Sequence, residues 1–551
     1  MGRVSGALYS RDPHPEVFTA IVGSQSDARG PERVGRLAWG HFDPDVAGKT
    51  YCDTEQLARL KRRMLSHLRA AVAPVSPETF ARFIGEWQGL DDPTPGTHRL
   101  RDALRRLEGL ALSISEWEGT VLPARVPGYR PQHLDALLAD GSLVWVASGS
   151  PAQRQGRVAF YLHESFDALA TISEPRPEAL DTPLSHEIIE LLSSRGAAFV
   201  QELLVRVVEP AAAAVETLEA CLIALLLEGV VTNDTALPLR GLGQSPARRG
   251  PTGRTQRRAP GGADALALKR LGGRWSLVSA LAFTPKAPTE MLFARITTLL
   301  GRYGALARNM MAAEPWPGGF AALYEGLKLM EERGVVRRGH SVEGLNGPQF
   351  ASPQAVERLR RARDQVAVVV GPIDALMSTH KPDVRLLGAL DPANPWGAIF
   401  DFPTGRSDAV RPKRLSRASI ITVDGAPALW VSPNAGRLLT LWTTPPSDAV
   451  VLAVFQRLAE VATQHRDGLL INSVDGDTPR VSAYQGALRE AGFRSHSRGL
   501  ILYPHNVPTA KPLKVDSTSA DNTSRPDATQ SPESAARRIA ARRAMLRRRR
   551  R

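Results

Sequence analysis

LIALLLEGVVTN, at residues 222–233, joins an apolar run with helical spacing to a short run of β-branched residues through Gly229. Glycine can adopt the left-handed conformation that ends a helix, and the Val-Val-Thr that follows favours an extended strand. A helix, a tight turn and a strand in this order form the second half of a winged helix. Glycine also ends many helices in other folds, so a single copy of the pattern does not decide the fold.

The same pattern occurs at three other places in the chain. LDALLADGSLVW (134–145), LKLMEERGVVRR (327–338) and ALREAGFRSHSRGLIL (487–502) align with it on Gly141, Gly334 and Gly492. An acidic residue lies one or two positions before each glycine, and an apolar residue lies four positions before it. These apolar residues are Leu137, Leu225, Met330 and Leu488. The recurrence predicts tandem winged-helix domains.

Length and charge limit the classes of protein that this chain can be. A chain of 551 residues with 43% hydrophobic residues has room for about three to four domains with real cores. The formal net charge of +14 is concentrated in two segments: residues 240–270 carry a net +7 and residues 506–551 a net +8, so the remainder is close to neutral. Segments of this kind act as electrostatic arms for a polyanion, so we expect nucleic acid as the partner.

The cysteine content and the hydropathy pattern indicate a reduced, cytoplasmic protein. Cys52 and Cys221 are the only cysteines, and the chain start has no secretory signal pattern. The longest apolar run, around residues 211–231, is interrupted by three glutamates, so we expect a buried helix there and no membrane association.

The chain divides into seven expected segments, and the predicted fold class is α+β with tandem winged helices followed by a small β-barrel-like module. We expect little packing in the amino-terminal segment and disorder in the basic tail. The segments are 1–50 (poorly ordered amino-terminal segment), 51–172 (helical region and first winged helix), 173–240 (second winged helix), 241–271 (basic flexible linker), 272–362 (third winged helix), 363–505 (barrel-like module with closing helices and strand) and 506–551 (disordered basic tail).

Short apolar runs suggest the strands of the barrel-like module. VAVVV (366–370), GAIFDF (397–402), ASIITVDGAPALWVS (418–432) and GRLLTLW (436–442) fit this interpretation. Asp424-Gly425 between two apolar runs is a strong hairpin signal. GGRWSLVSAL (272–281) is expected to open the third winged helix.

Motifs for catalysis by bound nucleotide or metal are missing from the sequence. Gly48-Lys49-Thr50 resembles the end of a phosphate-binding loop, but Asp43 occupies the position of the required first glycine and no apolar strand precedes it. Histidine and cysteine never cluster at ligand spacing, and no GxSxG motif occurs. We therefore expect no cofactor, no metal and no ATP hydrolysis.

Winged helices bind duplexes with a helix in the major groove and with the wing along the phosphates, so basic residues at wings and helix ends are the candidate contacts. These are Arg240, Arg302, Arg308, Arg337 and Arg338. Trp275 and Trp316 could stack on bases, although packing in a core is the common role of tryptophan.

Much of the chain resembles the carboxy-terminal portion of the bacterial large helicase-related (Lhr) proteins. The resemblance runs in unbroken order from about Tyr51 to Pro504, and it is most specific at PGGFAALY followed by RRG, VEGL and QFA. Other matching runs are YCDTEQLARLKRR, PVSPETFARFIGEWQGL, LPARVPGYRPQHLDALLADGSLVW, LLGRYGALARNMMAAE, ALDPANPWGAIFDFP and AGFRSHSRGLILYP.

The resemblance implies a DNA-binding accessory region of a DNA repair helicase, with tandem winged helices and a β-barrel similar to AlkZ-type DNA glycosylases. In that family the region follows a helicase core that this sequence lacks, so a helicase core encoded separately and a second copy of this chain are the expected protein partners. An oligomerisation or docking scaffold for such a helicase is a further alternative function. Excision of uracil or another damaged base is a second implied activity, which needs a carboxylate. The best candidate for this carboxylate is Asp391 in DPANPWG, although an aspartate before a proline also starts ordinary turns. The paired glutamine and glutamine or aspartate of AlkZ-type enzymes are not evident, because Gln201 lacks its partner two residues later.

Overall fold

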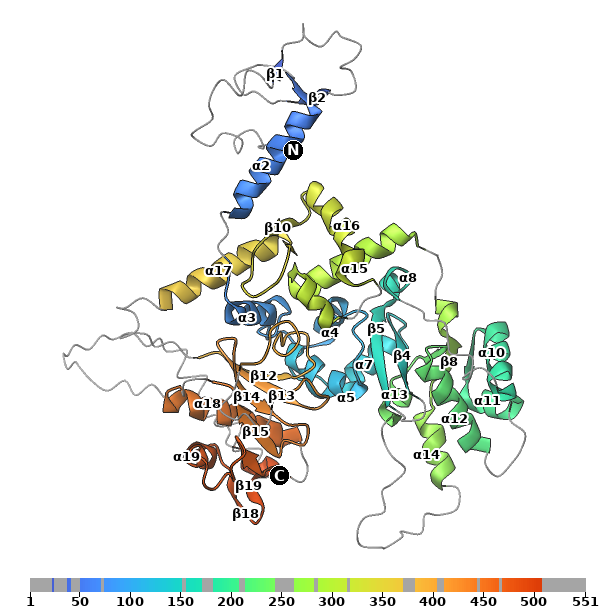
Figure 1. The fold of residues 1–551 in the computed structure, drawn as a ribbon. Coiled ribbons are helices and arrows are strands. Elements are labelled where there is room, and N and C mark those ends of the chain that lie inside the picture. The colour runs from blue at the N-terminus through green and yellow to red at the C-terminus, as the bar shows by residue number, and fades with distance from the viewer. Residues whose placement is uncertain are drawn as a thin grey trace, which may run out of the picture. The chain divides into compact units, whose positions relative to one another are not determined.

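The computed structural model describes residues 22–23, 37–40, 50–70, 74–150, 155–170, 182–207, 214–242, 262–281, 286–314, 318–369, 382–403, 411–442, 446–464 and 468–507. Helices and sheets alternate through this part of the chain (Figure 1), so the predicted mixture of helix and strand is confirmed. Trp316 and the basic tail from residue 508 onward lie outside the described residues.

The amino-terminal part contains a small sheet and two helices. The sheet has the order β1-β3-β2, and two of its strands lie in the segment for which the sequence predicts little order. The elements are β1 (Val22–Gly23), β2 (Leu37–Gly40), β3 (Thr50–Asp53), α2 (Thr54–Ala70) and α3 (Pro77–Trp87). Ser76 caps α3 by accepting a hydrogen bond from Thr79 N, and Pro77 occupies its first position, where its missing N–H costs no hydrogen bond.

The first winged helix ends in a long two-stranded wing. Its elements are α4 (Thr97–Arg106), α5 (Ile114–Glu116), the π-helical turn η3 (Trp117–Val121), α6 (Leu122–Arg125), α7 (Pro131–Ala139), β4 (Leu143–Ser150) and β5 (Gln155–Leu162). An isolated antiparallel bridge joins Leu112 to Val158 of β5. The short helices η5 (His163–Ser165) and α8 (Phe166–Leu169) follow the wing.

The second winged helix contains residues that the sequence assigns to its neighbours. Its elements are α10 (Pro183–Arg195), β6 (Ala197–Phe199), α11 (Val200–Val207), α12 (Ala214–Leu227), β7 (Val231–Asn233), α13 (Leu237–Gly241), α14 (Gly262–Arg270), β8 (Arg274–Leu277) and η6 (Val278–Leu281). The sheet order is β6-β8-β7, so β8 belongs here and does not open the third winged helix.

The basic linker of the sequence prediction therefore lies between the two wing strands β7 and β8. Residues 262–270 of that linker form α14, which packs against α12 and α13. The linker prediction missed α14 because the arginines and prolines before it dominate the local composition. In the sequence, the arginine-rich residues 243–261 are an insertion in the wing of the second winged helix.

The third winged helix has the sheet order β10-β11-β9. Its elements are α15 (Pro288–Tyr303), β9 (Ala305–Leu306), η7 (Arg308–Ala312), α16 (Gly319–Glu332), β10 (Arg337–Gly339), β11 (Gln349–Ala351) and α17 (Pro353–Val369). Residues 366–369 of the predicted strand VAVVV continue α17, so that strand prediction is wrong. The preceding run VERLRRARDQ is strongly helical, and the helix extends through the β-branched residues at its end.

The four glycines that align in the sequence all have positive φ, between 71° and 103°. Each follows the last residue of its helix by two positions, in α7, α12, α16 and α19 (Gln485–Glu490). In three copies the N–H after the glycine donates to the carbonyl of the apolar residue four positions before it, at Leu225, Met330 and Leu488. This is the Schellman arrangement that ends helices, and it confirms the predicted turns.

Two open sheets and the α-helices α18 (Asp448–Ala459) and α19 make up the described part of the last module (Figure 1). Its strands are β12 (Val384–Gly388), β13 (Ser419–Val423), β14 (Ala426–Val431), β15 (Arg437–Thr440), β16 (Leu469–Ile471), β17 (Ser473–Val474), β18 (Arg494–His496) and β19 (Gly499–Leu502). The sheet orders are β12-β13-β14-β15-β17 and β16-β19-β18, so the described strands form no closed barrel. Asp424 and Gly425 connect β13 and β14, which confirms the predicted hairpin.

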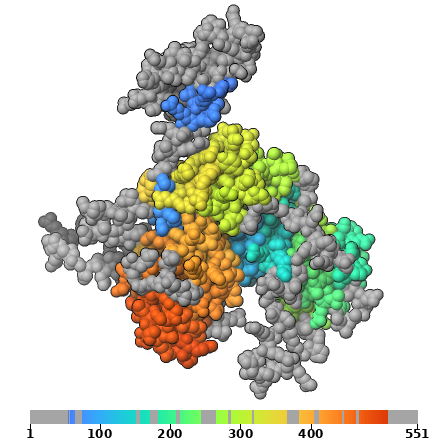
Figure 2. Space-filling view, viewed as in Figure 1, coloured from blue at the N-terminus to red at the C-terminus, as the bar shows by residue number. Residues whose placement is uncertain are grey.

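The helices and both sheets of this module pack around one shared core. Residues of α18 (Asp448–Ala459) and α19 pack with β13–β17 and β19 around Phe455 and Tyr484, and η9 (Glu460–Gln464) extends α18. The module as a whole is drawn in orange and red in Figure 2. GAIFDF contains no strand, because residues 396–400 form a turn closed by a bridge between Trp396 and Phe400.

Two large cores each join parts that are distant in the sequence. One core contains α3, the third winged helix and the turn around Trp396, while the other combines the first and second winged helices. Trp87 packs in the first of these cores and donates its indole N–H to Gly301 O at 2.8 Å. The helix α3 is therefore packed with the third winged helix, although it precedes the first in sequence.

Candidate nucleic-acid interface

The helix that precedes each wing is the element that a winged helix normally places in the major groove, and here these helices are acidic. α7 carries one carboxylate, α12 two and α16 three, against the single lysine Lys328 in α16. With Lys328 as their single lysine or arginine, these three helices offer little positive charge to the phosphates that line a groove. The basic side chains that can contact phosphates must lie on other elements.

The helix α12, the turn that follows it and the strand β7 pack against β4 in the wing of the first winged helix. Thr232 Oγ1 donates to Trp145 O at 2.7 Å, and a side chain at Gly229 would lie 3.3 Å from Ala147 O. The first and second winged helices consequently share one core and present one combined surface.

Arg240, a predicted DNA contact, connects the first two winged helices. From α13 its guanidinium donates to Glu118 at 2.7–3.2 Å and to Asp135 on α7 at 2.9 and 3.0 Å. These carboxylates raise the pKa of Arg240, although burial alone would lower it. The structure gives this side chain a contact between domains.

Arg302 and Trp275 are also predicted contacts, and both are buried. Arg302 is 1% exposed and reaches from α15 to the first winged helix, where it donates to Arg106 O and Glu108 O, and it also pairs with Glu314. Trp275 is fully buried and donates to Leu271 O at 2.9 Å. Because both side chains are buried, neither can contact a nucleotide.

The third winged helix places its remaining predicted contacts on the surface. Arg308 at the start of η7 and Arg337 in β10 are exposed. Arg338 is half-buried and stacks over the rings of Tyr324 and Phe350, each 5.9 Å from the guanidinium carbon. Asn346 N donates to Asn309 at 3.0 Å, so the wing loop is fixed to η7. Arg308 and Arg337 are therefore available to phosphates.

A basic loop at residues 411–417 was missed as a site by the sequence interpretation. RPKRLSR has four cationic residues in seven positions, and that density was the available signal. Arg411, Lys413 and Arg417 are exposed, whereas Arg414 donates to Asn394 O at 2.8 Å and its pKa is lowered by burial. The loop is anchored by Trp430, which donates to Lys413 O at 3.0 Å.

The end of this loop rests on the first winged helix. Arg417 has a φ of 64°, which is uncommon for a residue with a side chain, and its N–H donates to Glu116 at 2.6 Å. Ser416 Oγ donates to the same carboxylate at 3.1 Å. The buried carboxylate of Glu116 therefore holds the backbone of Arg417 in an unfavourable conformation, so the surroundings fix the conformation of this loop.

Asp391, the predicted excision carboxylate, is buried in an ion pair. Its two oxygens accept from Arg125 of α6 at 2.7 and 2.9 Å, and Oδ1 also accepts from Ala393 N at 2.7 Å. Asp391 and Arg125 are each 1% exposed. Arg125 further donates to Gln88, whose amide donates to Arg302 O at 2.9 Å. The pair therefore belongs to a buried polar network that joins four parts of the chain.

Replacing Glu116 with glutamine should remove one source of pH dependence from stability. Burial raises the pKa of Glu116 above its ordinary 4.5, and the hydrogen bonds from Arg417 and Ser416 oppose this shift. The folded protein thus holds this proton more tightly than the unfolded chain, so the free energy of unfolding falls as pH rises from 4.5 through the folded pKa. Glu116→Gln keeps an acceptor for Arg417 N but cannot titrate, so its free energy of unfolding should not fall over this pH range.

Urea denaturation between about pH 4 and 8 measures the effect. The exposed Glu343→Gln is the control and should retain the pH profile of the wild type. Identical profiles for Glu116→Gln and the wild type would contradict the assignment.

Neither a metal-binding cluster nor a membrane-spanning helix occurs among the described residues. No group of three or more histidine, cysteine, aspartate or glutamate side chains in this part of the chain could hold a metal ion. Among the same residues, no helix combines the length and the apolar character that a membrane span requires.

Comparisons with known proteins agree with the geometry. Residues 75–163 and 285–369 match winged-helix domains of the large helicase-related protein. The chain is 33% identical over 487 residues to a Mycolicibacterium smegmatis protein named Lhr helicase/probable uracil glycosylase, covering 85% of this chain and 31% of that protein. It is 31% identical over 474 residues to an Escherichia coli Lhr helicase/uracil glycosylase, covering 81% and 30%.

This chain therefore spans about a third of the length of these relatives, and the resemblance to the large helicase-related proteins is confirmed. Among solved structures, the Streptomyces sahachiroi DNA glycosylase AlkZ is similar with a TM-score of 0.41 and 16% identity. The similarity covers 70% of this chain and 96% of the glycosylase.

Proposed function

We propose that this protein binds DNA through surface cations around its winged helices, as an accessory module of the Lhr type. The observation that carries the proposal is the match of two domains to Lhr winged helices, together with exposed cations at Arg308, Arg337 and the loop 411–417. Because the helices before the wings are acidic, wings and loops supply the contacts, and these contacts go to phosphates. Binding is therefore expected to show little sequence preference.

The salt dependence of binding tests this proposal. Each of Arg308→Ala, Arg337→Ala and Lys413→Ala should reduce the slope of log affinity against log salt by about 1, equally for unrelated sequences. Fluorescence anisotropy with single-stranded and duplex oligonucleotides of random sequence gives the slopes.

Arg105→Ala is the matched control, because Arg105 is half-exposed but already paired with Glu164 at 3.0 Å. It should leave the slope unchanged. Unchanged slopes in the three test variants as well would show that DNA contacts lie elsewhere or that the module does not bind DNA.

A second candidate function is excision of a damaged base, because both relatives carry uracil glycosylase in their names. Under this hypothesis, a uracil-containing strand incubated with the protein develops alkali-labile sites. Asp391 remains the candidate carboxylate for this chemistry, although its ion pair with Arg125 would have to open before the carboxylate could reach a nucleotide. A helicase core supplied by another chain and assembly into a homo-oligomer remain further proposals for its partners.

A further inference from the structure

The wing of the third winged helix holds a guanidinium to which the described part of the chain gives no polar partner. Arg338 is half-buried in β10, where it lies directly opposite Phe350 of β11. Its guanidinium carbon lies 5.9 Å from the ring centroids of Tyr324 and of Phe350. Within the described residues, no hydrogen bond or ion pair engages this guanidinium, and none of its nitrogens is shielded from solvent. Its N–H groups are therefore available to a ligand.

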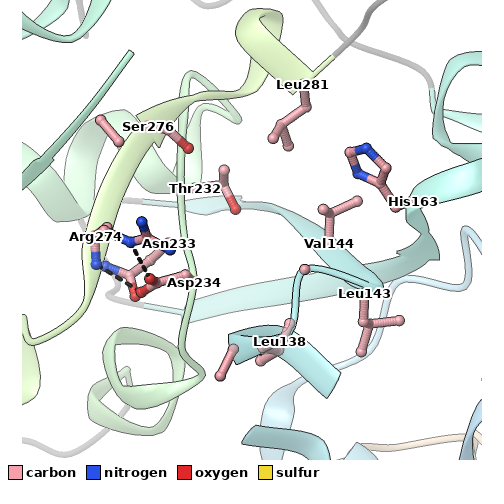
Figure 3. Close-up of a pocket in the computed structure, with 13 residues that line it drawn as sticks. Leu138, Leu143, Val144, His163, Thr232, Asn233, Asp234, Arg274, Ser276 and Leu281 are labelled. Carbon is pink, nitrogen blue, oxygen red and sulfur yellow. Dashed lines mark hydrogen bonds and ion pairs between the residues drawn. The ribbon is translucent and has the colours of Figure 1, made fainter. Parts of the chain in front are cut away.

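Carboxylates hold the guanidinium groups of other arginines in this structure. Arg274 lines the pocket drawn in Figure 3, and Asp234 accepts a hydrogen bond from Arg274 Nε at 2.8 Å. Arg240 pairs with Glu118 at 2.7 Å. Such partners neutralise the charge and occupy the donors. Arg338 is held by aromatic rings instead, and this contact fixes the guanidinium while its charge and its donors stay free.

The side chains and the backbone beside Arg338 leave room for a flat ligand. Tyr324 is half-buried, and its phenol oxygen has no hydrogen-bond partner among the described residues and is open to solvent. Phe320 lies one helical turn earlier on α16, with its ring centroid 6.2 Å from that of Tyr324. The strand β10 is at the edge of its sheet, and a Cβ at Gly339 would meet no neighbouring group within 4 Å. Arg338 and Tyr324 therefore lie at an open edge of the domain.

The charges around this edge favour a nucleotide strand. On α16, Lys328 lies four residues after Tyr324 and therefore on the same face, and its Nζ is 4.0 Å from the carboxylate of Glu325. These two charges offset each other, so the region beside the Tyr324 ring suits an uncharged base. The other two carboxylates of α16 lie about two helical turns beyond Tyr324. Arg338 supplies positive charge that no described carboxylate pairs with, and a single DNA strand combines uncharged planar bases with phosphates.

We propose that Arg338 and Tyr324 form a stacking site for one unpaired base of a single DNA strand. The base stacks on the side of the guanidinium that faces away from the two rings, with its edge beside the phenol of Tyr324. N–H groups at the rim of the guanidinium donate to a phosphate of the same strand. This inference rests on the proposed DNA binding, and it adds a preference for unpaired strands at this wing.

Arg338→Lys tests the site, because lysine keeps the positive charge and lacks the planar group. Fluorescence anisotropy at several salt concentrations measures the affinity of the full chain for a single strand, for a blunt duplex and for a strand of equal length built from tetrahydrofuran abasic residues. Arg338→Lys should lower the affinity for the ordinary single strand at least about fivefold at every salt concentration, the effect of one stacked base. Its salt slope, and its affinities for the duplex and the abasic strand, should equal those of the wild type.

Two further variants complete the test. Tyr324→Leu removes a ring that holds Arg338 and should reproduce the loss that is confined to the ordinary single strand. Arg358→Lys is the matched control, because Arg358 is exposed and its guanidinium carbon lies 5.3 Å from the ring centroid of Trp87, outside this wing. It should bind all three DNAs as the wild type does. Far-ultraviolet circular dichroism verifies that each variant is folded.

The three DNAs separate this proposal from the proposed function. If Arg338→Lys weakens binding to the abasic strand as much as to the ordinary strand, the guanidinium contacts phosphate only and no base stacks on it. If folded Arg338→Lys and Tyr324→Leu bind the ordinary strand like the wild type, the stacking site is rejected while DNA binding stands. If the wild type binds none of the three DNAs, the stacking site and the proposed function fail together.

Discussion

Asp391→Asn should lower the free energy of unfolding by about 3–5 kcal/mol, because it leaves the guanidinium of Arg125 buried beside a neutral amide. Both groups are 1% exposed, and water cannot replace the lost carboxylate. In the wild type the guanidinium of Arg125 donates to both oxygens of Asp391. An asparagine offers one acceptor oxygen, and its NH2 group is a donor that faces the guanidinium donors. Urea denaturation at neutral pH measures the loss.

Two variants calibrate that result. Asp91→Asn breaks the pair between Asp91 and Arg385, whose N···O distance is 2.8 Å, but Asp91 is half-exposed, so the expected cost is below about 1 kcal/mol. Arg125→Met/Asp391→Leu removes both buried charges and should recover most of the stability lost in Asp391→Asn. Equal stability of Asp391→Asn and the wild type would show that the ion pair is not a structural element.

The double variant also decides whether Asp391 acts in excision. If the wild type excises uracil and the folded double variant retains this activity, the carboxylate serves structure only. If the folded double variant loses about 100-fold or more of the excision rate while DNA binding persists, Asp391 takes part in the chemistry. A wild type that binds DNA but forms no abasic sites from several damaged bases excludes the glycosylase hypothesis.

The sequence predicted local features well because they depend on neighbouring residues. The turns at Gly229 and Gly334 and the hairpin at Asp424-Gly425 follow from backbone preferences that act within a few positions. The mixture of winged helices was predictable for the same reason, since each copy carries its own helix-glycine-strand signal.

Long-range pairing could not be predicted from those signals. The strand β8 pairs with β6, about 75 residues away in the sequence, and with β7, more than 40 residues away, and no local preference encodes that choice. The same limit applies to the site, because Arg302 and Asp391 look like ordinary surface residues until their partners Glu108 and Arg125 are brought near. The apolar residues of α15 indicate which face of that helix is buried, but the role of Arg302 depends on its hydrogen bond to Arg106 O in α4.

Removing the charge of the two basic segments should have the largest effect on DNA affinity. The last 44 residues, 508–551, carry twelve lysines and arginines, and residues 243–261 carry five arginines within the wing of the second winged helix. A protein that neutralises about six to ten phosphates loses about 10³–10⁵ in affinity between 50 and 200 mM salt. If half of these twelve cations contact DNA, deleting residues 508–551 should lower the salt slope by about 5.

A variant of full length with the same twelve residues replaced by glutamine separates charge from chain length, and it should match the deletion. Replacing the five arginines of residues 243–261 by glutamine should lower the slope further, because each arginine can neutralise another phosphate. Anisotropy titrations at four salt concentrations give each slope. Slopes that stay at the wild-type value in both charge variants would show that the folded surface around Arg308, Arg337 and the loop 411–417 supplies the phosphate contacts alone.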